Sequence, residues 1–233
     1  MVESEIDKVI KRYEHRTNIV SEGKYSMLNP AVWQTVQERQ RKLINLFSKN
    51  IKKPLAELSL LEIGCGTGGN ILELIRLGFS PNNIIGNELL PERTKLSRKN
   101  LPAECKIIEG DASTLPYKKH TFDIVYQSTV FTSLLDLEFQ KKLAECMWEW
   151  VKPGGAVLWY DFIFNNPSNP DVKGVSLRRV KELFPDAIIS FKRVTLAPPI
   201  SRRVTKIHPS LYSTFNFFPF LRTHILCWIS KAE

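Results

Sequence analysis

The chain has 233 residues, of which 43% are hydrophobic and 24% are charged, and its formal net charge is +9. This length suits one α/β domain with appended segments and is short for two domains of ordinary size. The composition is typical of a soluble globular protein and argues against a disordered or fibrous chain. The acidic start and the interrupted apolar stretch 211–230 predict neither a secretory signal nor a membrane-spanning helix, so we expect a cytoplasmic protein.

The four cysteines lie far apart, with no C-x-x-C pair and no histidine at ligand spacing. Such spacing supports neither a disulfide framework nor a zinc site, and we expect no bound metal. We expect reduced cysteines that are mostly buried, at Cys65, Cys105, Cys146 and Cys227.

Positive charge gathers between residues 171 and 210, where nine basic and three acidic residues give a local charge of +6. Four interpretations stay open for this region: a solvated basic face, an anionic substrate, peripheral contact with a membrane surface, or nucleic acid.

Residues 1–58 show no strand pattern. Asn29 and Pro30 suit the start of a helix, and the apolar residues that follow recur at roughly helical spacing. We therefore expect a helical cap over residues 1–58, in front of a main domain over 59–233. The residues that carry the spacing are Val32, Val36, Leu43, Leu46 and Phe47.

From residue 59 onward, strand-like and helix-like segments alternate, which predicts crossover connections and a mainly parallel α/β sheet. Seven strands are expected, at 59–63, 83–89, 105–109, 122–127, 156–162, 187–196 and 223–230. Helices are expected at about 69–77, 91–100, 137–151 and 176–183.

The first predicted strand runs into a glycine turn, residues 64–69, and Glu62 lies two residues before its first glycine. Such a turn lets backbone approach a ligand closely and directs helix N-terminal amides at it. The turn matches the pattern G-x-G-x-x-G, which is also found in dinucleotide-binding proteins. A carboxylate at Glu62 sits poorly beside a pyrophosphate, so it favours a cationic, phosphate-free nucleoside such as S-adenosylmethionine.

Acidic residues end the next two predicted strands. Glu88 lies 24 residues after Gly64, close to the offset at which an acid accepts hydrogen bonds from ribose hydroxyls. Asp111 follows the third strand, where it can accept from an adenine amine or simply cap a turn. Residues 152–155, Lys-Pro-Gly-Gly, predict a tight turn into the fifth strand.

This ordered set resembles the class I S-adenosylmethionine-dependent methyltransferases, strongly over residues 59–162 and more loosely over the last two strands. The resemblance implies a Rossmann-like sheet of seven strands with an antiparallel last strand and helices on both faces. It also implies that Glu88 holds the ribose, that Asp111 and Ala112 meet the adenine, and that Gln127 approaches the methionine amino group. The full set of expected cofactor contacts is Glu62, Gly64, Cys65, Gly66, Gly68, Asn70, Glu88, Leu89, Asp111, Ala112 and Gln127.

Methyl transfer from a sulfonium is an in-line displacement that relies on positioning and needs a base only for a poorly acidic acceptor. Many members of the family carry a histidine pair where this chain has Thr132 and Ser133. We expect Asp161 to be the base, because it ends an apolar strand where its pKa would be raised, with His208 as the next candidate. Asp136 and His224 are further candidates.

The acceptor is expected between the N-terminal cap and two insertions, near 163–175 and 197–221. The sequence predicts O-methylation of a polar small molecule or glycan, possibly an anionic one. Two alternatives stay open: an RNA or protein methyltransferase that uses the basic region 171–210, and a non-catalytic module that binds a nucleoside.

Overall fold

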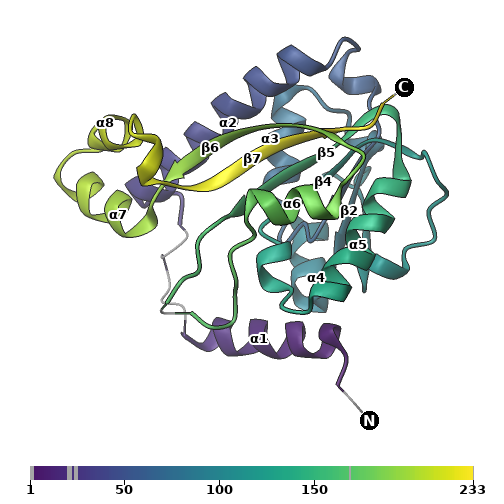
Figure 1. Ribbon diagram of the computed structural model, residues 1–233, viewed down its shortest axis with the longest axis horizontal. Coiled ribbons are helices and arrows are strands. Elements are labelled where there is room, and N and C mark those ends of the chain that lie inside the picture. The colour runs from purple at the N-terminus through teal and green to yellow at the C-terminus, as the bar shows by residue number, and fades with distance from the viewer. Residues whose placement is uncertain (1–2, 20–22, 24–25, 168, 233) are drawn as a thin grey trace.

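The computed structural model describes residues 3–19, 23, 26–167 and 169–232, and Figure 1 shows it as a ribbon. One seven-stranded sheet forms its centre, in the order β3-β2-β1-β4-β5-β7-β6. The strands are β1 (Leu60–Ile63), β2 (Ile84–Glu88), β3 (Lys106–Glu109), β4 (Phe122–Ser128), β5 (Val151–Phe162), β6 (Ile188–Leu196) and β7 (Arg222–Ser230).

Strands β1 to β5 pair in parallel, whereas β7 runs antiparallel to both β5 and β6. The expected Rossmann-like, mainly parallel sheet with an antiparallel last strand is therefore confirmed. In the register, Ile63 lies beside Asn87 on one side and Gln127 on the other, so β1, β2 and β4 end level with one another. Ligands of such sheets bind at this carboxyl edge.

Eight α-helices are described: α1 (Glu5–Ile19), α2 (Pro30–Asn50), α3 (Gly69–Leu77), α4 (Pro91–Asn100), α5 (Leu137–Trp150), α6 (Leu177–Leu183), α7 (Pro198–Ile207) and α8 (Leu211–Asn216). Short 3-10 turns join them: η1 (Leu55–Glu57), η2 (Pro81–Asn83), η3 (Ala112–Thr114), η4 (Phe131–Ser133) and η5 (Pro219–Leu221). Within the described residues, no helix is both long and apolar enough to cross a bilayer.

The core has two layers because neighbouring strand residues point to opposite faces of the sheet. On one face, Leu61, Val157 and Trp159 pack with the apolar side of α5 and α6. On the other face, Leu60 and Leu158 pack with α2 and α3. Burial on both faces explains why the central strands are almost continuously apolar.

Two sequence expectations change in the structure. Residues 152–155 do not form a turn ahead of the fifth strand. They bulge out of β5, since Phe122 pairs with Val151 and Ile124 already pairs with Ala156. The Lys152 ammonium closes the bulge by binding Asp123, 2.8 Å away. The insertion 197–221, in which the sequence analysis placed no helix, contains α7 and α8.

The region 1–58 is helical as expected, but its two helices serve different parts of the fold. Helix α2 covers one face of the sheet through Leu43 and Phe47. Helix α1 lies across the carboxyl edge and adds Val9 to the opposite core layer (Figure 1). Three cysteines are buried and Cys146 is half-buried.

Candidate cofactor and acceptor site

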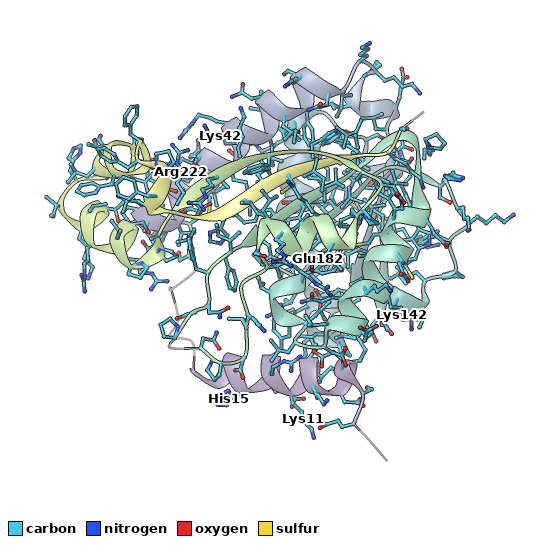
Figure 2. The ribbon with its side chains drawn as sticks, in the orientation of Figure 1. Lys11, His15, Lys42, Lys142, Glu182 and Arg222 are labelled. Atoms are coloured by element: carbon cyan, nitrogen blue, oxygen red, sulfur yellow. The ribbon has the colours of Figure 1, made fainter. Side chains whose placement is uncertain are left out.

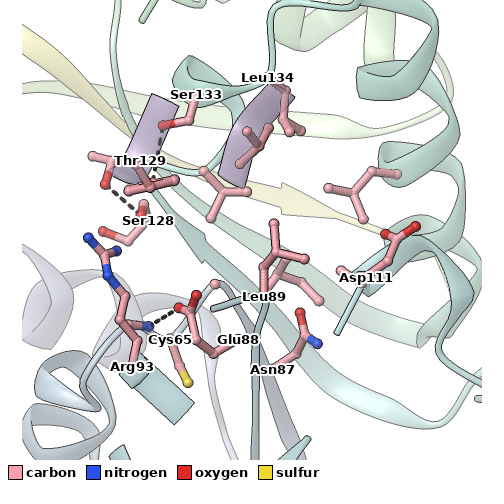
Figure 3. A pocket seen from close by; sticks show the side chains of 18 of the residues that line it. Cys65, Asn87, Glu88, Leu89, Arg93, Asp111, Ser128, Thr129, Ser133 and Leu134 are labelled. Carbon is pink, nitrogen blue, oxygen red and sulfur yellow. Dashed lines mark hydrogen bonds between the residues drawn. The ribbon is translucent and has the colours of Figure 1, made fainter. Parts of the chain in front are cut away.

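A cavity of about 500 Å³ opens at the carboxyl edge of the sheet, between β1, β2, β4 and helix α1. Figure 3 shows Glu88 and Asp111 on its walls, with Ser128, Thr129 and Ser133 on the side of the loop after β4. This volume lies in the range of cavities that hold a small ligand or cofactor.

The glycine turn brings backbone to the cavity in a conformation that side chains disfavour. Gly64, Gly66 and Gly68 have φ of 63°, 59° and 90°. A Cβ on Gly64 would lie 2.6 Å from Val130 Cγ2, whereas a Cβ on Gly66 would meet nothing within 4 Å. The turn is thus packed behind Gly64 and leaves open space in front of Gly66, where a ligand can approach the backbone.

Glu88 joins the end of β2 to this turn. Its Oε2 accepts a hydrogen bond from Gly66 N at 2.8 Å and its Oε1 accepts one from Leu90 N at 3.0 Å. The side chain is buried and lines the cavity. Each carboxylate oxygen can accept a further bond, so Glu88 can also receive two ribose hydroxyls.

Asp111 and Ala112 lie at the start of η3 on the cavity wall. Asp111 accepts from Ser113 N and from Ser113 Oγ, both at 2.8 Å. The carboxylate therefore does cap a turn, and its remaining lone pairs are available to an adenine amine. Leu89 and Leu134 line the same part of the cavity and offer apolar surface to a flat ring (Figure 3).

Glu62 lies behind the cavity wall. It has no exposed surface, and its Oε1 accepts from Asn70 Nδ2 at 2.7 Å. Its Oε2 has no hydrogen-bond partner among the described residues, and burial raises the pKa of Glu62 to about 8. Asn70 does line the cavity, so Glu62 positions the amide that faces the ligand.

Most of the predicted cofactor contacts line the cavity, but three do not. Besides Glu62, the exceptions are Gly68, whose Cβ position faces Leu101, and Gln127, which is buried with Oε1 bound to Val130 N at 3.1 Å. The predicted residues that do line it are Gly64, Cys65, Gly66, Asn70, Glu88, Leu89, Asp111 and Ala112.

Neither predicted base lines the cavity. Asp161 has no exposed surface and accepts from Thr132 N at 3.3 Å and Phe162 N at 3.1 Å, behind η4. Burial raises the pKa of Asp161 to about 7. His208 is exposed after α7 and accepts from Ser210 N. Both assignments stay predictions, and for Asp161 to meet an acceptor η4 would have to move.

The other two candidates have structural partners. Asp136 accepts from Glu138 N and Phe139 N at the start of α5. His224 stacks on Tyr160, with ring centroids 5.0 Å apart, and burial lowers the pKa of His224 to about 3. A neutral, half-buried imidazole at this place packs on the sheet.

Helix α1, which belongs to the cap 1–58 expected beside the acceptor, forms a wall of the cavity through residues that the sequence analysis did not single out. Ile6, Val9 and Tyr13 line the cavity, and Lys11 and His15 point away from it (Figure 2). Tyr13 bridges the site, because its hydroxyl lies 3.2 Å from Ser133 Oγ and the Arg93 guanidinium lies 4.4 Å from its ring centroid. The spacing of Ile6, Val9 and Tyr13 is that of one helix face, which is the signal that could have found this wall.

Two ion-paired residues fasten α1 beside the loop after β4. Glu5 binds Arg12 and accepts from Leu135 N at 2.8 Å. Arg12 also donates to Ser133 O at 3.1 Å. Of Thr132 and Ser133, Ser133 lines the cavity and Thr132 N donates to Asp161.

Arg39 of α2 also lines the cavity, and the sequence analysis did not single it out. Its Nη2 binds Glu73 at 2.9 Å, and its guanidinium lies 5.4 Å from the Tyr160 ring centroid. Its Nε has no hydrogen-bond partner among the described residues. This cation can receive an anionic group of a ligand.

Comparisons with known proteins agree with this geometry. Residues 61–159 match the family model of the methyltransferase domain. The chain is 32% identical over 124 residues to the sterol 4-C-methyltransferase strm-1 of Caenorhabditis elegans, covering 48% of this chain and 34% of that protein. It is 31% identical over 154 residues to the phthiotriol/phenolphthiotriol dimycocerosates methyltransferase 1 of Mycobacterium ulcerans, covering 62% of this chain and 54% of that protein.

Among solved structures, the fold resembles that of phosphoethanolamine N-methyltransferase 1 of Haemonchus contortus in complex with phosphoethanolamine and S-adenosylhomocysteine. The TM-score is 0.64 at 13% identity, covering 98% of this chain and 49% of that one. The chain thus spans between a third and just over half of the length of these relatives. Residues 61–159 thus match a methyltransferase domain, and the sheet order and the glycine turn with Glu88 agree with the class I S-adenosylmethionine-dependent methyltransferases that the sequence resembles.

Proposed function

We propose that the chain transfers a methyl group from S-adenosylmethionine to an acceptor that binds in the cavity lined by α1 and the loop after β4. The observation that carries this proposal is the hydrogen bond from Gly66 N to Glu88 at 2.8 Å. It holds the glycine turn and the ribose-binding carboxylate in one unit with open space in front of Gly66. These residues fit a nucleoside that brings no phosphate to the turn.

Bound S-adenosylmethionine supplies an electrophilic methyl group on a sulfonium whose leaving group departs neutral. The work left to the chain is to orient the acceptor and exclude water. Ile6 and Val9 of α1 cover the cavity, and Val130 and Ser133 lie across from them. A base is needed only for a poorly acidic acceptor, for which Asp161 stays the predicted group.

For the acceptor, we infer O-methylation of a polar small molecule or glycan. Hydroxyl groups of Ser128, Thr129 and Ser133 line the cavity and can orient such a molecule. Arg39, whose side chain lines the cavity and binds Glu73, brings a positive charge that supports an anionic acceptor.

A second acceptor class, an amphiphile, is favoured by the apolar wall of Ile6, Val9 and Val130. The relatives named above as sterol and phthiotriol methyltransferases support it. For an RNA or protein acceptor, the support is the basic region 171–210. Part of that charge is engaged within the fold, because Arg178 pairs with Glu182 and Arg179 donates to Leu137 O.

Calorimetry with S-adenosylmethionine, S-adenosylhomocysteine and NAD tests the cofactor. We expect the first two to bind, Glu88→Gln to weaken binding, and Glu109→Gln, an exposed neighbour on β3, to leave it unchanged. Preferential NAD binding would contradict the proposal.

A labelled-methyl assay then separates the acceptors. Aqueous and organic-solvent fractions of a cell extract are offered, each with and without nuclease. We expect label in a nuclease-resistant product, water-soluble for a polar acceptor and solvent-extractable for an amphiphile. Cofactor binding without transfer to any fraction would identify a non-catalytic binding module.

A further inference from the structure

One end of the molecule exposes apolar side chains that the core does not use. We name Ile207, Phe217, Phe218 and Phe220 the aromatic end; their exposed fractions are 79%, 77%, 44% and 71%. They belong to the segment of α7, α8 and η5, which stands out beyond the sheet in Figure 1. The rings of Phe217 and Phe220 each lie 5.7 Å from that of Phe218, so the three form one cluster. Contiguous exposed apolar groups of this kind mark an interaction surface.

The sequence around the aromatic end is basic throughout. Residues 188–222 contain six lysines and arginines and no aspartate or glutamate. Arg202, Arg203 and Lys206 are exposed on α7, and none of them forms an ion pair with a described residue. The aromatic end is therefore flanked by positive charge that the fold itself leaves uncompensated.

The segment that carries the aromatic end is hydrogen-bonded to the rest of the fold. Tyr212 of α8 donates to the buried Glu38 of α2 at 2.7 Å and accepts from Leu196 N at 3.3 Å. Arg222, labelled in Figure 2 at the start of β7, donates to Asn216 O at 2.8 Å. These hydrogen bonds hold the segment against the rest of the fold. The phenylalanines are therefore exposed in the folded protein, and their exposure does not come from local unfolding.

We propose that the aromatic end docks on the surface of an anionic lipid bilayer. Aromatic and aliphatic groups enter the boundary between headgroups and acyl chains, and flanking lysines and arginines bind anionic headgroups. The complementary charge selects this occupant over a second copy of the chain, whose equally basic surface would repel it. Ile207 argues against RNA, because an aliphatic side chain offers no face on which a base can stack.

Sedimentation with lipid vesicles tests the proposal on the whole chain, without reference to its activity. The vesicles are equal parts phosphatidylglycerol and phosphatidylcholine, compared with phosphatidylcholine alone. We expect binding to the anionic vesicles that weakens with added salt and is at least about tenfold weaker on the neutral ones.

Two sets of variants locate the contact. Phe217→Ser with Phe220→Ser removes the rings, and its control, Ile188→Ser with Leu137→Ser, removes exposed apolar side chains elsewhere. Arg202→Glu, Arg203→Glu and Lys206→Glu reverse the charge, and their control is Lys49→Glu, Lys52→Glu and Lys53→Glu, at and just beyond the far end of α2. We expect each test variant to lose at least about tenfold in vesicle affinity and each control to bind like the wild type.

Cofactor affinity and thermal unfolding check that the variants fold. A Phe217→Trp variant, which keeps a ring at that position, adds a direct readout: brominated acyl chains should quench its added fluorescence. Absence of vesicle binding, test variants that bind like their controls, or single-stranded RNA binding by this surface without vesicle binding would each overturn the proposal.

Discussion

The two sides of the cavity are built by different means. On the cofactor side, residues 60–128, the site is held by contacts between the ends of strands that follow one another in the chain. The bond from Gly66 N to Glu88 is an example. On the acceptor side and in the packing behind it, contacts join segments far apart in the chain, as in Tyr13 with Ser133 at the cavity and Glu38 with Tyr212 outside it. A repeating strand–turn–helix unit can carry the cofactor site, whereas the acceptor site depends on the whole fold.

The two sides also differ in which residues adopt positive φ angles. The cofactor turn places glycine at its positive φ angles. Beside the acceptor side, Thr129 and Thr195 have φ of 59° and 65°, a conformation that costs a β-branched residue free energy. Both are bound to Tyr160: Thr129 N donates to Tyr160 O at 2.8 Å, and Thr195 Oγ1 lies 2.7 Å from the Tyr160 hydroxyl. Hydrogen bonds there offset a strain that glycine avoids.

The largest effect is expected on the cofactor side, from Glu88→Ala. The change leaves Gly66 N and Leu90 N without their acceptor and removes the carboxylate proposed to hold the ribose. Hydrogen bonds to a charged group contribute about 1.5–3 kcal/mol each, so S-adenosylmethionine affinity should fall roughly 100-fold or more. Calorimetry measures it, with Glu109→Ala as the matched control. Equal affinity in both variants would contradict the assignment of Glu88.

Tyr212→Phe should act on the acceptor side alone. It leaves the buried Glu38 carboxylate with the Thr195 N–H at 3.0 Å and without the phenol. We expect the free energy of unfolding to drop by about 1–3 kcal/mol, measured by urea denaturation. Cofactor affinity should stay within about twofold of the wild type, since Tyr212 does not line the cavity. A large loss of cofactor affinity would show that the two sides are coupled.

Most of the residues predicted to contact the cofactor line the cavity, because the signals that point to them are local. The glycine turn, Glu88 and Asp111 each follow directly from a strand, and strand order then brings them together. The cap was expected to border the acceptor, but the contacts that α1 makes there were not predicted, because Tyr13 meets residues more than 75 positions away and no short motif records such a contact.

Asp161 shows what residue type alone leaves out. Its position at the end of an apolar strand was correct, but the pleat decides its direction. Val157 and Trp159 face the layer of α5 and α6, and alternation puts Asp161 on that same face, behind η4. Strand alternation, applied to β5, could have predicted this burial.

A pH series on Asp161→Asn tests that placement. The pKa of Asp161 is raised to about 7 in the folded protein, above its ordinary value near 3.8. Between those values the unfolded chain is ionised and the folded chain stays protonated, so the free energy of unfolding falls as pH rises toward 7. The contribution is roughly 2–4 kcal/mol, and Glu62 adds a loss of the same sign toward its pKa of about 8.

Asp161→Asn should therefore flatten the wild-type decline in stability between pH 5 and 8, measured by urea denaturation. An unchanged slope would place the carboxyl in contact with water. Measuring the turnover of Asp161→Asn tests the catalytic prediction. If Asp161 is the base, turnover should fall at least about tenfold while cofactor affinity is unchanged. Retained turnover with the flattened slope would leave Asp161 as a residue that positions η4.

The smallest effects are expected at Thr195. Two substitutions there distinguish the free-energy cost of the backbone strain from that of losing a hydrogen bond. Thr195→Val keeps the disfavoured φ and loses the hydroxyl contact with Tyr160, at a cost of about 1–2 kcal/mol. Thr195→Gly loses the same contact but relieves about 1–2 kcal/mol of backbone strain, against about 0.5–1 kcal/mol for glycine's greater freedom in the unfolded chain. Glycine should therefore cost less than valine in urea denaturation. If glycine costs as much as valine, the backbone at Thr195 stores no strain, and the acceptor side would differ from the cofactor side only in the range of its contacts.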